Sequence, residues 1–185
     1  MIKVVALLLV VAVGVFLVYV ALKPAEFRIT RSQSIHASPE KIFALINDLH
    51  AFNRWNSFSA GDAGLKLDYS GPQTGQGAAY TWDSTGKTGK GRMTIIDSSA
   101  PSRVAMRLEF IKPMTATNTA EFALVSAGAS TTVTWSMRGT NTFLYKLMGT
   151  IFNMDKMVGG EFEKGLANLE AIADSKCSTS LAFSA

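Results

Sequence analysis

Residues able to do chemistry are few in this chain, and they form no recognised catalytic or metal-binding pattern. The two histidines, His36 and His50, lie in no metal-ligand motif. His36 falls on the polar side of an alternating segment, and His50 is expected at a helix end, where a cation complements the helix dipole. The single cysteine, Cys177, allows no intrachain disulfide. The sequence therefore predicts no metal site, no cofactor and no catalytic histidine.

A nucleophile or a phosphate-binding loop is not indicated either. The chain has no G-x-S-x-G motif and no Cys-His arrangement that would activate a nucleophile. Gly86-Lys87-Thr88 is similar to the end of a phosphate-binding loop, but the first glycine of that motif would fall at Thr81. A hairpin turn is the simpler interpretation of this segment.

Arg31 and Gln33 stand out because of their position in an alternating pattern. They share the parity of apolar Phe27 and Ile29, so a regular strand would point them toward the interior. A buried guanidinium is costly unless it has an anionic partner. A ligand carboxylate or phosphate could supply that partner, and so could a protein acid such as Asp155. Both interpretations stay open at this point.

The N-terminus carries a long apolar run that limits where the protein works. No charged residue occurs from Val4 to Leu22, and a helix of that length spans about 28 Å, close to the hydrocarbon thickness of a bilayer. A cleaved signal peptide is the alternative, but its apolar region is shorter, about 15 residues, and no small-x-small cleavage site follows here. We expect residues 1–25 to be a single-pass membrane anchor. Lys3 and Lys23 flank the run, so the positive-inside rule leaves the side of the domain unknown.

Composition fits one domain beyond this anchor. The 185 residues are 48% hydrophobic and 17% charged, with a net charge of +4. The basic residues are scattered, which does not indicate a nucleic-acid partner. A mildly basic domain held beside anionic lipid is the simpler interpretation.

The first part of that domain reads as a strand, two short helices and then about six strands. Residues 26–37 alternate in polarity, and Ser38-Pro39 predicts the start of a helix. Turn residues divide residues 65–138 into half-buried antiparallel strands.

The last part reads as one long helix. Apolar residues recur at spacings of three and four over residues 141–174, with Gly159-Gly160 as a kink or a point of close approach. A flexible tail is expected over residues 176–185. Strands followed by a segregated helix indicate an α+β fold, and a strongly curved sheet around one helix leaves space for a site.

A resemblance supports this arrangement. The segment RSQSIHASPEKIFALINDLHAFNRWNSFS resembles the opening of the SRPBCC superfamily of START-like or Bet v 1-like proteins, in its polyketide cyclase/dehydrase and lipid transport branch. Further pieces follow in the same order: Gly71-Pro72, Gly75-x-Gly77-Ala78, Tyr80-x-Trp82, Gly91-x-Met93-x-Ile95, Leu108-x-Phe110, Pro113-Met114, Thr132-x-Thr134-Trp135 and Phe162-x-x-Gly165-Leu166.

The resemblance implies a domain over residues 26–175 with the helix-grip fold. In that fold a curved antiparallel sheet of about seven strands surrounds a long C-terminal helix and an apolar cavity. It also implies binding of lipids, polyketides or other hydrophobic molecules, with catalysis in some members only.

The expected site is a cavity that takes a small hydrophobic ligand. Aromatic and methionine side chains on the inner face of the sheet are both core and pocket wall, with polar residues at one end. The expected lining residues are Arg31, Gln33, Tyr80, Trp82, Met93, Met106, Leu108, Phe110, Phe122, Trp135, Phe152, Asp155 and Leu166.

Two other functions are kept as alternatives. A cyclase or dehydratase would need an acid or base in the pocket, for which Asp155, Arg31 and Tyr80 are the candidates. A protein-interaction domain would use the cavity only as core, and the sequence identifies no protein partner.

Overall fold

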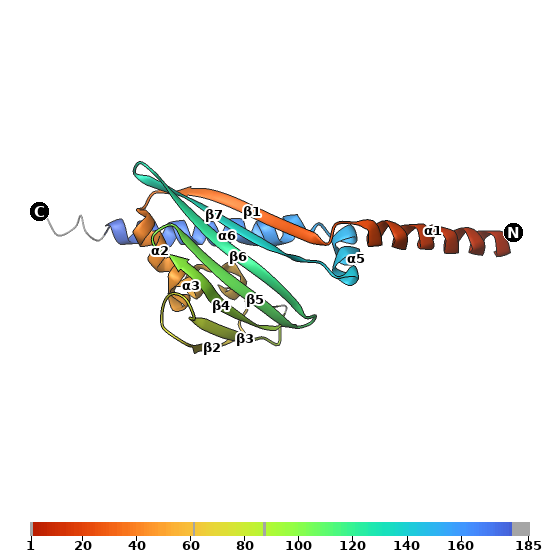
Figure 1. The fold of residues 1–185 in the computed structure, drawn as a ribbon, viewed down its shortest axis with the longest axis horizontal. Coiled ribbons are helices and arrows are strands. Elements are labelled where there is room, and N and C mark those ends of the chain that lie inside the picture. The colour runs from red at the N-terminus through yellow and green to blue at the C-terminus, as the bar shows by residue number, and fades with distance from the viewer. Residues whose placement is uncertain (1, 61, 87, 179–185) are drawn as a thin grey trace, which may run out of the picture.

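The N-terminal helix stands apart from the rest of the molecule. The computed structural model describes residues 2–60, 62–86 and 88–178. Helix α1 (Ile2–Leu22) extends away from the domain, and Val20 is its only buried residue (Figure 1). By length and composition α1 could cross a membrane, a property that it shares with signal sequences.

A single antiparallel sheet forms the body of the domain, as predicted. Its strands are β1 (Glu26–Ile35), β2 (Lys66–Ser70), β3 (Ala79–Asp83), β4 (Lys90–Ser99), β5 (Arg103–Lys112), β6 (Ala116–Ala127) and β7 (Ser130–Thr140). They are ordered β1-β7-β6-β5-β4-β3-β2, so β1 and β2 are the edges. A register shift between Ile95 and Asp97 interrupts the β4–β5 ladder, and such irregularities increase local twist and bending.

Three short helices connect β1 to β2. Helix α2 (Pro39–Asn47) starts as expected, because the Ser38 hydroxyl accepts a hydrogen bond from the Lys41 backbone N–H. Helices α3 (Leu49–Trp55) and α4 (Ser57–Ala60) follow. The expectation for His50 was wrong: it lies in the first turn of α3, where its ring stacks on Tyr69 at a centroid distance of 3.7 Å.

The predicted long helix is two helices, α5 (Phe143–Ile151) and α6 (Met154–Ser178). The break falls at Phe152, whose backbone is extended, and at Asn153, whose side-chain oxygen accepts a hydrogen bond from the Lys156 N–H. Of the two expectations for Gly159-Gly160, the close approach is confirmed at Gly159, where a Cβ would overlap the Arg31 guanidinium, and both glycines lie inside α6. Of the predicted tail, residues 176–178 belong to α6, and residues 179–185 lie outside the described residues.

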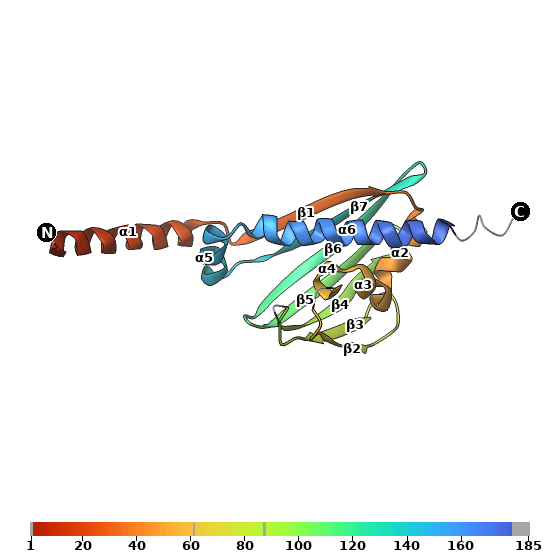
Figure 2. The ribbon, with the colours of Figure 1, turned by 180° about the vertical axis from the view of Figure 1, so that it is seen from behind.

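Helix α6 lies across the concave face of the sheet, along edge strand β1 (Figure 2). The end of this face beside α2 is solidly packed. Its fully buried side chains include Ile35, Ile42, Ile46, Val104, Val133 and Leu169. Alternate residues of each strand face this core, so the sheet covers one layer of helices.

Candidate functional site

The other half of the concave face is hollow. A cavity of about 1540 Å³ lies between the sheet and the helices, at the end of the domain from which α1 extends. In each of β1, β5, β6 and β7 the inward residues nearer α1 line the cavity, whereas Ile35, Val104, Leu124 and Val133 at the α2 end are packed core. The cavity is therefore a partly open pocket that begins where the packed core ends.

Most of the predicted site residues line this cavity. Those that do are Tyr80, Trp82, Met93, Met106, Leu108, Phe110, Phe122, Trp135, Phe152 and Asp155. They are not equivalent in position. Met106 and Phe122 are fully buried in the wall, whereas Phe152 is 53% exposed at the α5–α6 break. The inner wall is thus apolar, and its outer margin is open to solvent.

Arg31, Gln33 and Leu166 do not line the cavity. Leu166 is part of the packed core. Arg31 pairs with Trp135 across the β1–β7 ladder, so it faces the concave side as its parity predicts. At the position of Arg31, α6 packs against β1, so the side chain meets α6 and not the cavity. Gln33 likewise donates a hydrogen bond to Glu170 of α6.

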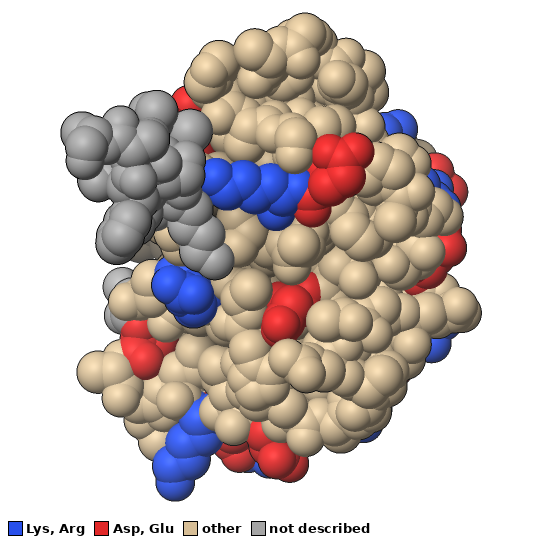
Figure 3. All heavy atoms as spheres, turned by 90° about the vertical axis from the view of Figure 1, so that its left-hand side faces the viewer, with Lys and Arg blue, Asp and Glu red and all other residues tan. Residues whose placement is uncertain are grey.

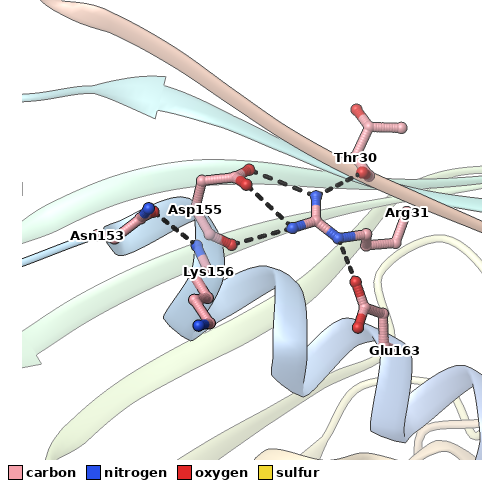
Figure 4. Close-up of polar contacts among 6 residues, drawn as sticks. All are labelled: Thr30, Arg31, Asn153, Asp155, Lys156 and Glu163. Atoms are coloured by element: carbon pink, nitrogen blue, oxygen red, sulfur yellow. Dashed lines mark hydrogen bonds and ion pairs between the residues drawn. The ribbon is translucent and has the colours of Figure 1, made fainter.

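Arg31 is fully engaged with α6 and its own strand (Figure 4). Its Nε donates to Glu163 Oε1 at 2.6 Å, its Nη2 donates to Asp155 Oδ2 at 3.0 Å, and its Nη1 donates to the Thr30 carbonyl. The hydrogen bonds to Asp155 and Glu163 raise the pKa of the guanidinium. Of the two partners that the sequence left open for Arg31, the structure contains the protein acid. Gly159 makes room for this contact, since a Cβ there would overlap the guanidinium.

A buried amide that sequence reasoning missed also lines the cavity. Asn118 of β6 is 9% exposed, and the only hydrogen-bond contact of its side chain to a described residue is a weak one with Met137 Sδ at 4.0 Å. Buried polar groups normally have stronger partners. The sequence signal was the parity of β6, because Asn118 shares the inward face of this strand with Ala116 and Ala120.

Trp135 forms the wall where the cavity meets the core. Its ring stacks on Phe162 of α6, with centroids 4.1 Å apart and an interplanar angle of 8°. Its Nε1 is buried and has no hydrogen-bond partner among the described residues. This side chain therefore contributes by packing and not by a hydrogen bond.

The β3–β4 hairpin closes one side of the cavity through Asp62. The carboxylate accepts hydrogen bonds from the Ser84 hydroxyl, from the Thr88 hydroxyl at 2.8 Å and from the Gly64 N–H at 3.1 Å. These bonds, the one from Ser84 foremost, lower the pKa of Asp62. Asp62 and Thr88 both line the cavity, so the network joins the loop before β2 to the hairpin at its margin.

The groups considered for acid or base chemistry are poorly suited to it. Burial raises the pKa of the Tyr80 hydroxyl, so this group holds its proton at neutral pH. Asp155 is committed to Arg31. Within residues 2–60, 62–86 and 88–178, no group of three or more His, Cys, Asp or Glu side chains could hold a metal ion.

A curved antiparallel sheet, one long helix across its concave face and an apolar cavity between them define a helix-grip domain of the START-like class. The chain belongs to the family described as polyketide cyclase / dehydrase and lipid transport, whose model matches residues 26–174. The match covers the whole domain from β1 into α6 and excludes α1.

Solved structures show the same fold at low sequence identity. A protein from Chromobacterium violaceum is 12% identical with a TM-score of 0.57, over 82% of this chain and 98% of that one. One from Rhizobium loti is 20% identical with a TM-score of 0.55, over 79% and 96%. One from Thermus thermophilus is 14% identical with a TM-score of 0.57, over 81% and 99%. No curated protein matches the chain.

Proposed function

We propose that this protein is a membrane-tethered domain that binds a small lipid-like molecule in its cavity. The single observation that carries the proposal is the apolar space of about 1540 Å³ left between the sheet and α6 in an otherwise packed core. The aromatic and methionine side chains that line this space lose contact with water when an apolar molecule occupies it, so such a molecule is stabilised there.

The chemistry of the wall suggests which part of the ligand it holds. Met93, Met106 and Phe122 present flexible or flat apolar surfaces, which suit an acyl chain or a fused ring. Asn118 is a buried polar side chain of the wall whose contact with Met137 is weak, so we assign it to a carbonyl or hydroxyl of the ligand. The Trp135 Nε1, which has no partner among the described residues, is a second donor in the same wall. Arg31 and Gln33 take no part, because their side chains are bound to α6.

A cyclase or dehydratase on the same fold is the weaker alternative. Burial raises the pKa of the Tyr80 hydroxyl, which makes it a weaker proton donor, and Asp155 is paired with Arg31 at the outer margin. A domain that only docks a protein has no need of an unfilled core. Neither alternative has an observation of its own in its favour.

Photolabelling in a membrane tests the proposal with the full chain. The protein is reconstituted in vesicles that contain a fatty acid carrying a diazirine on its acyl chain. Labelled peptides are then mapped by mass spectrometry. We expect saturable labelling of peptides from β5, β6 and β7, half-maximal at micromolar probe, or about −8 kcal/mol. Labelling of α1 alone would contradict the proposal.

Two methionines provide a matched pair of variants. Met106 is fully buried in the cavity wall, and Met106→Trp places a larger side chain in the space proposed for the ligand. We therefore expect this variant to abolish saturable labelling of the sheet. Met157→Trp makes the same change at a side chain that is 60% exposed and does not line the cavity, and we expect it to label like the wild type. Equal labelling of both variants would show that the probe binds elsewhere.

A further inference from the structure

We infer that the cavity opens against the bilayer that holds α1, and that α5 lies in the interfacial layer of that bilayer. The inference rests on the proposed function for its membrane anchor and its lipid-like ligand. It adds a docking surface, defined as the exposed apolar side of α5 with the α1–β1 junction, and it commits to a lipid surface as the partner.

The first step is the position of α5. Its Lys146 side chain donates a hydrogen bond to the Ala21 carbonyl, at the last turn of α1, at 3.2 Å. The junction is also fixed from the other side, since the Asn141 N–H donates to the Ala25 carbonyl at 2.7 Å. Both views show α5 beside the root of α1 (Figures 1 and 2). With α1 across a bilayer, α5 is held at its surface.

The second step is the composition of α5. Phe143 is 48% exposed, Leu144 49% and Met148 37%, and Phe152 at the end of the helix is 53% exposed. The segment FLYKLMGTI contains no acidic residue. Exposed apolar side chains with a basic and an aromatic residue among them are typical of helices that lie in a membrane interface. In water the same surface would be an unexplained apolar patch.

The third step is that this surface borders the cavity. Lys23 and Pro24 at the junction, and Tyr145, Lys146 and Gly149 of α5, all line it. The open margin of the cavity therefore coincides with the surface that faces the bilayer. A lipid-like molecule could pass between the two without exposing its apolar part to water.

Charge at this end of the sheet agrees with a bilayer that contains anionic lipid. Lys66, Lys90 and Lys112 gather around Asp83 at the strand ends nearest α1, and together they lower the pKa of its carboxyl, with the hydrogen bond from Lys90 as the largest cause. The opposite end of the molecule differs, since acidic and basic residues are dispersed there among uncharged ones (Figure 3).

Lipid quenching of a fluorophore tests the docking surface directly. The full chain with Cys177→Ser is given a single cysteine at one of three exposed apolar positions, Leu144→Cys, Met148→Cys or Val125→Cys, and is labelled with nitrobenzoxadiazole. Val125 is the control, because it is 63% exposed near the β6–β7 hairpin at the far end of the sheet. Vesicles of phosphatidylcholine and phosphatidylglycerol carry a nitroxide on the acyl chain near the headgroup.

We expect strong quenching at residues 144 and 148 and none at residue 125. Absence of quenching at 144 and 148 would overturn the inference, whether the label is exposed to water or shielded by a second copy of the chain. Crosslinking of a dimer through α5 would identify the second case.

Loading of the cavity supplies a separate measurement. The double variant Leu144→Glu/Met148→Glu should lower the rate of cavity photolabelling from the same bilayer about tenfold, and Val125→Glu should not change it. An unchanged rate in the double variant would contradict the membrane-facing mouth. Quenching at α5 with no cavity labelling in any variant would support the membrane contact and contradict only the proposed ligand binding.

Discussion

Trp135 is the residue at which packing and binding meet, because one side of its ring covers Phe162 and the cavity lies beside it. Trp135→Ala should cost about 3–5 kcal/mol of unfolding free energy, as for other buried aromatic residues. Trp135→Phe keeps a stacked ring and removes an Nε1 that makes no hydrogen bond to any described residue, so it should lose less than roughly half as much.

Urea unfolding of the full chain in mild detergent, followed by near-ultraviolet circular dichroism, measures both variants. Equal losses for Ala and Phe would mean that the Nε1 has a partner after all, for example in a bound ligand.

Asp62 gives a pH dependence with a defined sign. Its pKa is lowered in the folded protein by hydrogen bonds from Ser84 and Thr88. The carboxylate therefore contributes stability that is present above its unfolded pKa, near 4, and is lost as the pH falls through the lower folded pKa. Asp62→Asn should be less stable than the wild type at pH 7, and this difference should disappear in strongly acidic solution. A stability difference that is independent of pH would contradict this account.

At the scale of elements, the ion pairs of Arg31 with Asp155 and Glu163 join β1 to α6, and two adjacent glycines test their contribution. Gly159→Ala would push a Cβ into the Arg31 guanidinium and separate Arg31 from Asp155, so we expect destabilisation. Gly160→Ala has open space around its Cβ and should stabilise the helix by about 0.5–1 kcal/mol.

Arg31→Ala provides the control for this pair. In the Arg31→Ala background, Gly159→Ala should no longer lower the free energy of unfolding, because the guanidinium that its Cβ would displace is absent. The double-mutant cycle should therefore show strong coupling between the two positions. Additive effects of Arg31→Ala and Gly159→Ala would place the cost of the new methyl group elsewhere.

The strands and helices were more predictable from the sequence than the tertiary contacts of their side chains. Alternation in β5, β6 and β7 predicted strands and inward faces, because each has a dry and a wet side. The break between α5 and α6 was missed because apolar spacing continues through Phe152, and only the Asn153 cap marks it. Parity placed Arg31 on the correct face, but its partner depended on where α6 packs against β1, which is a tertiary contact.

Much of the cavity wall was predictable for the same reason, since inward parity selects wall residues in every strand. The presence of a cavity was also expected, from a strongly curved sheet around one helix, but its position at the α1 end was not, because that depends on how far α6 and α3 lie from the sheet. Asn118 was missed because a neutral amide is a weaker sequence signal than a charge or an aromatic ring, although its parity in β6 points inward.

At the scale of the whole molecule, the prediction to test is that α1 anchors the domain to a membrane. We predict that the full chain retains residues 1–25, sediments with membranes and resists an alkaline carbonate wash, because α1 has no charged residue from Val4 to Leu22 and is long enough to span a bilayer. Deletion of residues 1–25 should move the protein to the supernatant. Intact mass spectrometry separates the two interpretations, since a mature chain that begins after α1 would be the product of a cleaved signal peptide.

The junction between α1 and β1 has a consequence for how such a protein could serve a cell. Only Lys23, Pro24 and Ala25 separate helix from strand, and a proline in so short a connection leaves little freedom. With α1 in a bilayer, the domain has no reach beyond its own dimensions and cannot ferry cargo across an aqueous gap. The domain would stay at the surface of one membrane. Any molecule or membrane that delivers or accepts its ligand would have to reach that surface.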